Sequence, residues 1–223
     1  MYYGPRTVTN GLVLALDAAD KNSYKGSGTT WKDLSGNNNT GTLTNGPTFS
    51  SADGGSIVFD GANDHILMAD NNAFDFGTGD FAVELWAYFN TLSGSPTLFL
   101  FRNYYTGNNG FLFYITAAGA LSVYTTGTFS EGAASVGINR WQHFVFTRIS
   151  GTSYLYNNAA LRDSRSFTLN VSVNNSVVIG FDTQFNSDPL NGKVASARIY
   201  SGKGLTASQV LQNYNATKTR FGL

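Results

Sequence analysis

The chain of 223 residues contains no cysteine and only two histidines. The absence of cysteine excludes thiol nucleophiles and zinc sites built on thiolates. His65 and His143 are the only imidazoles that could act as a general base, and neither belongs to a recognisable catalytic triad. The sequence also has no G-x-S-x-G motif and no glycine-rich loop for phosphate. It therefore offers little for nucleophilic or phosphate chemistry.

Charge is scarce as well. Charged residues make up 13% of the chain, and 14 basic residues balance 14 acidic ones. Without a net charge or a basic run, the chain has no field to attract nucleic acid or an anionic membrane. The apolar run near the N-terminus, "LVLALDAA", is short and interrupted by Asp17, so it fits neither a signal sequence nor a membrane span. We expect no nucleic acid partner and no membrane insertion.

Glutamate occurs at only two positions, Glu84 and Glu131, and neither has a second acid within three residues. Retaining glycoside hydrolases need two carboxyl groups about 5–5.5 Å apart. Glu84 lies in the strand-like stretch "AVELWAY", where we expect it to pair with an Arg or a Lys rather than to act in catalysis. These features favour a protein that is not an enzyme.

Aromatic and β-branched residues are abundant, with 17 Phe and 12 Tyr among them. Short runs of such residues alternate with Gly, Asn, Asp and Ser, which is typical of a β-sandwich. Residues 79–90 alternate with period two and are mostly apolar on both faces, so we predict a central strand covered on both sides. Residues 140–161 predict a hairpin that turns at Ser150 and Gly151. Residues 25–47 have little periodicity and are expected to be rich in loops.

One helix is predicted near the C-terminus, in "LTASQVLQNYNA". Thr206 and Gln209 have the spacing of a capping box, and Ala207, Val210, Leu211 and Tyr214 follow at helical spacing. No linker divides the chain. We therefore expect an N-terminal arm at residues 1–10, free or docked on a neighbour, and one domain at residues 11–223.

Five stretches of the chain together carry a family resemblance. They are "GLVLALDAADKNSYKGSGTTWKDLSG", "IVFDGANDHI", "FDFGTGDFAVELWAYF", "RWQHFVFTR" with "YLYNNA", and "GKVASARIYSGKGLTASQVLQNYNA". In this order they resemble the laminin-G-like, concanavalin A-like jelly-roll domains. The resemblance implies an all-β fold, a two-sheet antiparallel jelly-roll sandwich with a short C-terminal helix. It also implies a face that binds glycans or proteins, and frequently a calcium ion.

Two loops carry oxygen ligands of the kind that calcium prefers. Asp60 and Asp64 flank a turn in "FDGANDH", where we favour the capping of backbone N–H groups over metal binding. Asp182, Gln184 and Asp188 in "GFDTQFNSDPLNG" have no evident duty in a turn. For this second loop, calcium binding and turn capping stay equally open.

A glycan-binding surface is a further hypothesis. Neutral sugars stack on aromatic rings, and amides bond their hydroxyl groups. The candidate residues are Tyr104, Tyr105, Asn108, Asn109, Phe185 and Asn186. The alternative is that these tyrosines flank strands and these amides fill turns, as in many β-sandwiches.

The opening segment "GLVLALDA…WKDLSG" resembles domains carried by virion proteins of tailed phages. This resemblance implies a non-enzymatic subunit of the virion surface, of the capsid decoration or adhesion type, located on the extracellular particle. Its partners would be other virion subunits of capsid or tail, further copies of itself, and cell-surface glycans. A carbohydrate-binding module of a secreted or cell-surface protein and a glycoside hydrolase remain as alternatives.

Overall fold

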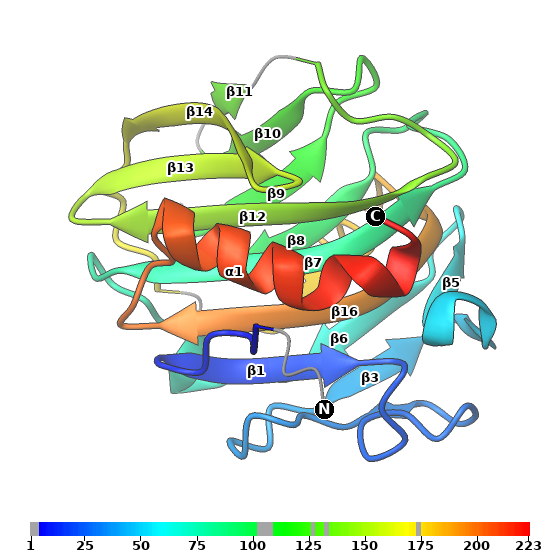
Figure 1. The fold of residues 1–223 in the computed structure, drawn as a ribbon. Helices are drawn as coiled ribbons and strands as arrows, with labels where there is room; N and C mark the ends of the chain where they lie inside the picture. The colour runs from blue at the N-terminus through cyan, green and yellow to red at the C-terminus, as the bar shows by residue number, and fades with distance from the viewer. Residues whose placement is uncertain (1–4, 102–108, 126–127, 132–133, 173–174) are drawn as a thin grey trace.

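The alternating segment at residues 79–90 forms β7 (Phe81–Phe89), a central strand in the first of two antiparallel sheets. The computed structural model describes residues 5–101, 109–125, 128–131, 134–172 and 175–223, with the side chains of 128–131 excepted. The two sheets pack face to face, and one helix, α1 (Ala207–Thr217), lies across the outside of the first (Figure 1). The predicted sandwich of the concanavalin A type is confirmed.

We name the first sheet sheet A. Its strands run in the order β14 (Ala160–Ser166), β13 (Thr152–Asn157), β12 (Trp141–Ile149), β7, β16 (Asn191–Ser201), β5 (Ser56–Asp60) and β4 (Thr48–Ser50). The long strand β16 pairs along one side with β7 and along the other with both β5 and β1 (Leu12–Asp17). The hairpin predicted at Ser150 and Gly151 joins β12 to β13 and is confirmed.

The second sheet, sheet B, supplies the other half of the core. Its strands run in the order β11 (Thr128–Glu131), β10 (Leu121–Tyr124), β9 (Phe111–Ile115), β8 (Thr97–Phe101), β15 (Val177–Ile179), β6 (His65–Met68), β3 (Gly41–Thr44) and β2 (Thr30–Trp31). Strands β2 and β3 lie inside residues 25–47, which sequence periodicity alone had assigned to loops. Trp31 is fully buried there, because these short strands close the edge of the core.

Strand β7 is buried on both faces, as predicted. Phe81, Val83 and Leu85 point into the core between the sheets, while Ala82 and Trp86 belong to clusters on the outer face. Helix α1 covers that outer face and begins at the predicted capping box, in which Thr206 caps Gln209 N and the Gln209 side chain returns to Thr206 N. Three short 3-10 helices, Ala52–Gly54, Asn72–Phe74 and Lys218–Phe221, complete the helical elements of the described residues.

The described part of the N-terminal segment, residues 5–10, docks on its own chain. The Val8 N–H donates to Asn213 Oδ1 at 2.8 Å, and the Val8 carbonyl accepts from the Tyr200 hydroxyl at 3.1 Å. Gln212 Nε2 donates to the Arg6 carbonyl at 2.7 Å. These contacts tie the segment to helix α1 and to strand β16. Within the described residues no helix is long and apolar enough to cross a membrane.

Candidate functional site

An apolar row crosses the outer face of sheet B, on the side of the sandwich opposite to α1. Leu112 of β9 pairs with Leu100 of β8 and with Tyr124 of β10. Val178 of β15 pairs with Leu100 and with Leu67 of β6. Paired residues in antiparallel strands project from the same face, so these five side chains form one line across five strands. We call this line the sheet B row.

Two hollows lie along this row, each lined in part by the connection between β15 and β16, residues 180–190. One hollow, of about 300 Å³, is lined by three aromatic rings and three polar side chains: Tyr114, Tyr124, Phe185, Ser95, Asp182 and Asp188. The other, of about 350 Å³, is lined by Leu100 and Val178 together with Asn175, Ser176, Thr183 and Gln184. Both volumes lie at the small end of the range for ligand pockets. Apolar floors with polar rims suit a ligand that has both apolar patches and hydroxyl groups.

The 180–190 connection is held by its own backbone and by Asp182. Asp182 Oδ1 accepts from the N–H groups of Gln184 at 2.9 Å and Phe185 at 3.2 Å. The backbones of Asp182 and Ser187 bond each other, and the Thr97 N–H donates to the Asp188 carbonyl at 3.0 Å. The aspartate therefore folds the loop, and Phe185 is left 47% exposed beside the hollow.

Among the predicted glycan-binding residues, Phe185 lines a hollow and Asn186 is exposed at the tip of the same loop with a left-handed φ of 54°. Asn109 is half-buried at the start of the chain leading to β9, and its carbonyl accepts from the Ser172 N–H at 3.0 Å. The remaining three predicted residues, Tyr104, Tyr105 and Asn108, lie outside the described residues.

Sequence reasoning missed Tyr114 and Tyr124. Both lie in strands, whereas the residues predicted to bind glycans come from stretches expected to be loops. A signal was present in "GFLFYIT", where Phe111 and Phe113 alternate with Leu112 and Tyr114. The phenylalanines belong to the core, so the tyrosine must project from the outer face.

The calcium prediction for residues 182–188 stays a prediction. Asp182, Gln184 and Asp188 are brought into one loop, and the buried Gln184 Oε1 has no hydrogen-bond partner among the described residues. These are oxygen donors of the right chemical kind. In the described part of the chain, however, no three His, Cys, Asp or Glu side chains are grouped as metal ligands. Backbone carbonyls and water would have to complete the coordination.

The turn at Asp60 and Asp64 crosses between the two sheets, because β5 belongs to sheet A and β6 to sheet B. Asp64 Oδ2 accepts from the Asp60 N–H at 3.0 Å, and Asp60 Oδ1 accepts from the Ala62 N–H at 2.8 Å. Burial raises the pKa of Asp64. Gly61 has a φ of 81°, and a Cβ at this position would approach the Asn191 side chain to 2.7 Å. Both acids therefore cap the turn, as favoured from the sequence.

His65 follows this turn and opens β6, a position from which a side chain faces either solvent or a neighbouring loop. The structure shows the second alternative: His65 is 6% exposed and lies against the 180–190 connection. Its ring lies against Phe181 with centroids 6.0 Å apart, and its Nδ1 is 2.9 Å from the Asn63 carbonyl oxygen. His65 shares the outer face of sheet B with Leu67, and Phe181 of the 180–190 connection covers its ring there.

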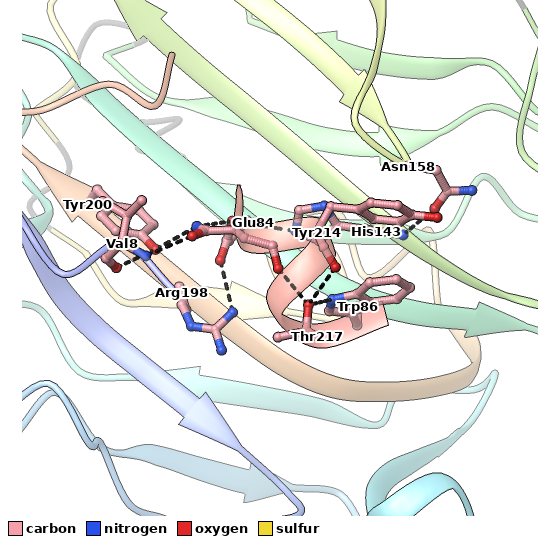
Figure 2. A network of polar contacts seen from close by, with 10 residues as sticks. Val8, Glu84, Trp86, His143, Asn158, Arg198, Tyr200, Tyr214 and Thr217 are labelled. Atoms are coloured by element: carbon pink, nitrogen blue, oxygen red, sulfur yellow. Dashed lines mark hydrogen bonds and ion pairs between the residues drawn. The ribbon is translucent and has the colours of Figure 1, made fainter. Parts of the chain in front are cut away.

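Glu84 lies on the opposite side of the sandwich, beneath helix α1 (Figure 2). Its carboxylate accepts from Arg198 Nη1 at 2.9 Å and from Asn213 Nδ2 at 2.9 Å. His143 Nε2 lies 3.4 Å from Glu84 Oε2. Asn213 also donates to the Tyr200 hydroxyl, so the group joins three strands of sheet A (β7, β12 and β16) to the helix and to the N-terminal segment.

The electrostatics of this buried group favour a charged glutamate. Burial alone would raise the pKa of Glu84, but the nearby His143 ring and the Arg198 guanidinium together lower it to about 2. Burial and the neighbouring Glu84 charge raise the pKa of Tyr200. The expected pairing of Glu84 with an arginine is confirmed. Because Glu84 has no exposed surface, a substrate cannot reach it while α1 is docked.

Comparison with known proteins identifies the family of this chain. The sequence profile of the concanavalin A-like lectin/glucanases superfamily matches residues 60–211. The chain belongs to this superfamily. Its match spans the strands of both hollows and the first five residues of α1. No curated protein sequence matches the chain with significance.

Solved structures share the fold at low sequence identity. The binding domain of Paraclostridial Mosquitocidal Protein 1 superposes with a TM-score of 0.73 at 19% identity, over 93% of this chain and 52% of that one. Domain 4 of AbnA, an extracellular arabinanase from Geobacillus stearothermophilus solved with arabinotriose, has a TM-score of 0.67 at 22% identity, over 91% of this chain and 98% of the domain. A sialidase mutant from Trypanosoma rangeli has a TM-score of 0.72 at 12% identity, over 97% of this chain and 35% of the enzyme. The chain thus spans about half of the toxin domain and about a third of the sialidase.

Proposed function

We propose that this chain is a non-enzymatic carbohydrate-binding domain that binds a neutral glycan across the outer face of sheet B. The observation that carries the proposal is the sheet B row with its two hollows. Tyr114, Tyr124 and Phe185 offer aromatic surface to the C–H faces of a sugar, and the half-buried carboxylate of Asp188 can accept from its hydroxyl groups, with the buried Asp182 beneath it. These two acids would repel an anionic sugar, which favours a neutral one.

A second support comes from fold likeness. Domain 4 of AbnA covers nearly the same fold and was solved with a bound arabinose oligosaccharide. Other members of the superfamily and its structural neighbours include enzymes, so the fold leaves the activity open. The non-enzymatic part of the proposal rests on the burial of Glu84 and on the shortage of glutamate. If instead a panel of polysaccharides yields products that Glu84→Gln abolishes, the domain is a hydrolase.

The setting we propose is the surface of a virus particle, where the domain would serve in capsid decoration or in adhesion. Its support is the resemblance of the opening segment to tailed-phage virion domains. The purified protein should then rebind particles that lack it. Failure to rebind, with glycan binding intact, favours the alternative setting of a secreted or cell-surface protein.

The binding proposal is tested on a glycan array followed by titration calorimetry. We expect Phe185→Ala and Tyr124→Ala to weaken binding of the best neutral ligand by about tenfold or more, because each removes a stacking surface. Leu211→Ala is the matched control, since Leu211 is 49% exposed, close to the 47% of Phe185, but lies on α1 at the opposite side. A blank array, or equal losses in all three variants, would contradict the proposal.

A further inference from the structure

A third hollow, of about 600 Å³, lies at the end of sheet A, away from the sheet B row. It lies where the start of β12, the turn between β13 and β14, and the C-terminal segment meet. The ring of Phe221 packs on Trp141 there with centroids 4.7 Å apart, and Figure 1 shows the C-terminal end beside β12. We call this hollow the sheet A hollow.

Two arginines line the sheet A hollow, Arg140 from the loop before β12 and Arg162 from β14. Among the described residues neither guanidinium has a carboxylate within ion-pair distance. Asp53 also lines the hollow, but its Oδ2 is engaged by Trp141 Nε1 at 2.9 Å. Arg140 Nη2 donates to the Ser135 carbonyl at 3.2 Å. Two guanidinium groups that have no carboxylate partner among the described residues therefore line the hollow, beside the acidic side chain of Asp53.

Hydrogen-bond donors without partners are gathered at the same place. Arg162 Nε, Asn157 Nδ2 and Ser135 Oγ are buried and have no hydrogen-bond partner in the described part of the chain. Asn157 is only 2% exposed. A buried donor left unsatisfied costs about 1–3 kcal/mol. These three atoms are enclosed by the protein, so a ligand that brings acceptor oxygens reaches them only if the side chains turn toward the hollow.

The rest of the wall is aromatic and amide-bearing. Tyr88 meets Trp141 edge to face, with ring centroids 5.7 Å apart, and Phe221 extends this apolar surface. Asn139 and Asn158 line the rim. Asn158 Oδ1 accepts from the His143 N–H at 2.9 Å, which leaves its amide N–H₂ to act as a donor. A simple inorganic anion would use the arginines but not this surface, whereas a sugar uses both.

We propose that the sheet A hollow is a second binding site, specific for a sugar that carries a carboxylate. Arg162 and Arg140 hold the carboxylate, Asn157 and Asn158 bond ring hydroxyl oxygens, and the sugar lies against Tyr88 and Trp141. The volume is large enough for one or two sugar rings. This site goes beyond the neutral glycan proposed for sheet B, because it lies on the other sheet and selects the opposite charge class.

The test is calorimetric titration of the intact protein with glucuronate and with N-acetylneuraminate, with glucose and inorganic sulfate as comparison ligands. We expect a carboxylate sugar to bind, glucose not to bind, and Arg162→Gln and Arg140→Gln each to weaken binding by about tenfold or more. Arg165→Gln is the matched control: Arg165 lies on the same strand, with a side chain 51% exposed and paired with Asp163. Phe185→Ala should leave this binding unchanged, which separates it from the neutral-glycan site.

Three outcomes would overturn the proposal. If neither acidic sugar gives binding heat at millimolar concentration, the proposed site does not exist. If Arg165→Gln loses as much affinity for the acidic sugar, the binding is general charge attraction and not a specific site. Sulfate that binds as tightly as glucuronate shows that the aromatic wall contributes nothing and that no sugar is recognised. Thermal unfolding of each variant distinguishes a misfolded variant from a folded one that has lost binding. Because Arg162 forms no ion pair with the described residues, we expect Arg162→Gln to fold.

Discussion

Replacement of Glu84 by glutamine provides a stringent test of the group beneath α1. The substitution keeps the shape of the side chain and removes its charge. Arg198 is then left 8% exposed without an anionic partner. Breaking a buried ion pair from one side costs roughly 3–5 kcal/mol. We expect a loss of this size in the free energy of unfolding at neutral pH, because nothing else in the group can neutralise the guanidinium.

The pH dependence of the free energy of unfolding gives an independent value for the contribution of the Glu84 charge. The pKa of Glu84 is about 2 in the folded protein, against an ordinary value of 4.5. A carboxyl group with a lowered pKa stabilises the fold above its unfolded pKa, and this contribution is lost as the pH falls. The full contribution is about 3 kcal/mol, and about 2 kcal/mol of it should be gone by roughly pH 3. Glu84→Gln should lack this part of the acid sensitivity.

Urea unfolding followed by tryptophan fluorescence measures both effects. Trp86 stacks on Tyr214 of α1 at 5.6 Å, so its emission reports on the docking of the helix. Glu84→Gln combined with Arg198→Met should recover most of the lost stability, because the double variant leaves no buried charge. The pair of Arg165 and Asp163 is the control: the Arg165 side chain is 51% exposed, and Arg165→Gln should cost less than about 1 kcal/mol.

Two results would refute this reasoning. The first is a Glu84→Gln variant within about 1 kcal/mol of the parent protein, since the pair would then be no stronger than one on the surface. The second is an unchanged loss in the double variant, which would assign the cost to packing rather than to an unpaired charge.

Two further predictions concern the helix and the loop. Thr206→Ala removes the cap of α1 and should lower the free energy of unfolding by about 1 kcal/mol, measured in urea, whereas Thr206→Ser should retain most of it; equal losses would contradict the role of the hydroxyl. If Asp182, Gln184 and Asp188 help to hold calcium, a chelator should lower the melting temperature by roughly 5 °C, and added calcium should restore it. An unchanged melting temperature would remove the calcium prediction.

Local sequence was sufficient for the features that depend on near neighbours. The alternation of residues 79–90 predicted a strand buried on both faces, because side chains in a strand point to opposite sides in turn. The spacing of Thr206 and Gln209 predicted the start of α1, since both bonds of the capping box lie within one turn. The turn at Asp60 and Asp64 was likewise assigned from the hydrogen-bonding habits of aspartate within a few residues.

Only the tertiary structure decided which side chains meet across strands. The sheet B row unites Leu67, Leu100, Leu112, Tyr124 and Val178 because β15 inserts between β6 and β8, an order that no local pattern specifies.

On the outer face of sheet A, too, only the tertiary structure decided which side chains meet. Glu84 was expected to find a basic partner, but its partners Arg198 and Asn213 lie 114 and 129 residues away in the chain. The sheet A hollow, with Arg140 and Arg162 on separate strands or loops, also escaped sequence reasoning. Side-chain alternation and capping act over a few residues, whereas a binding surface on a sandwich depends on strand order, which is set by packing of the whole chain.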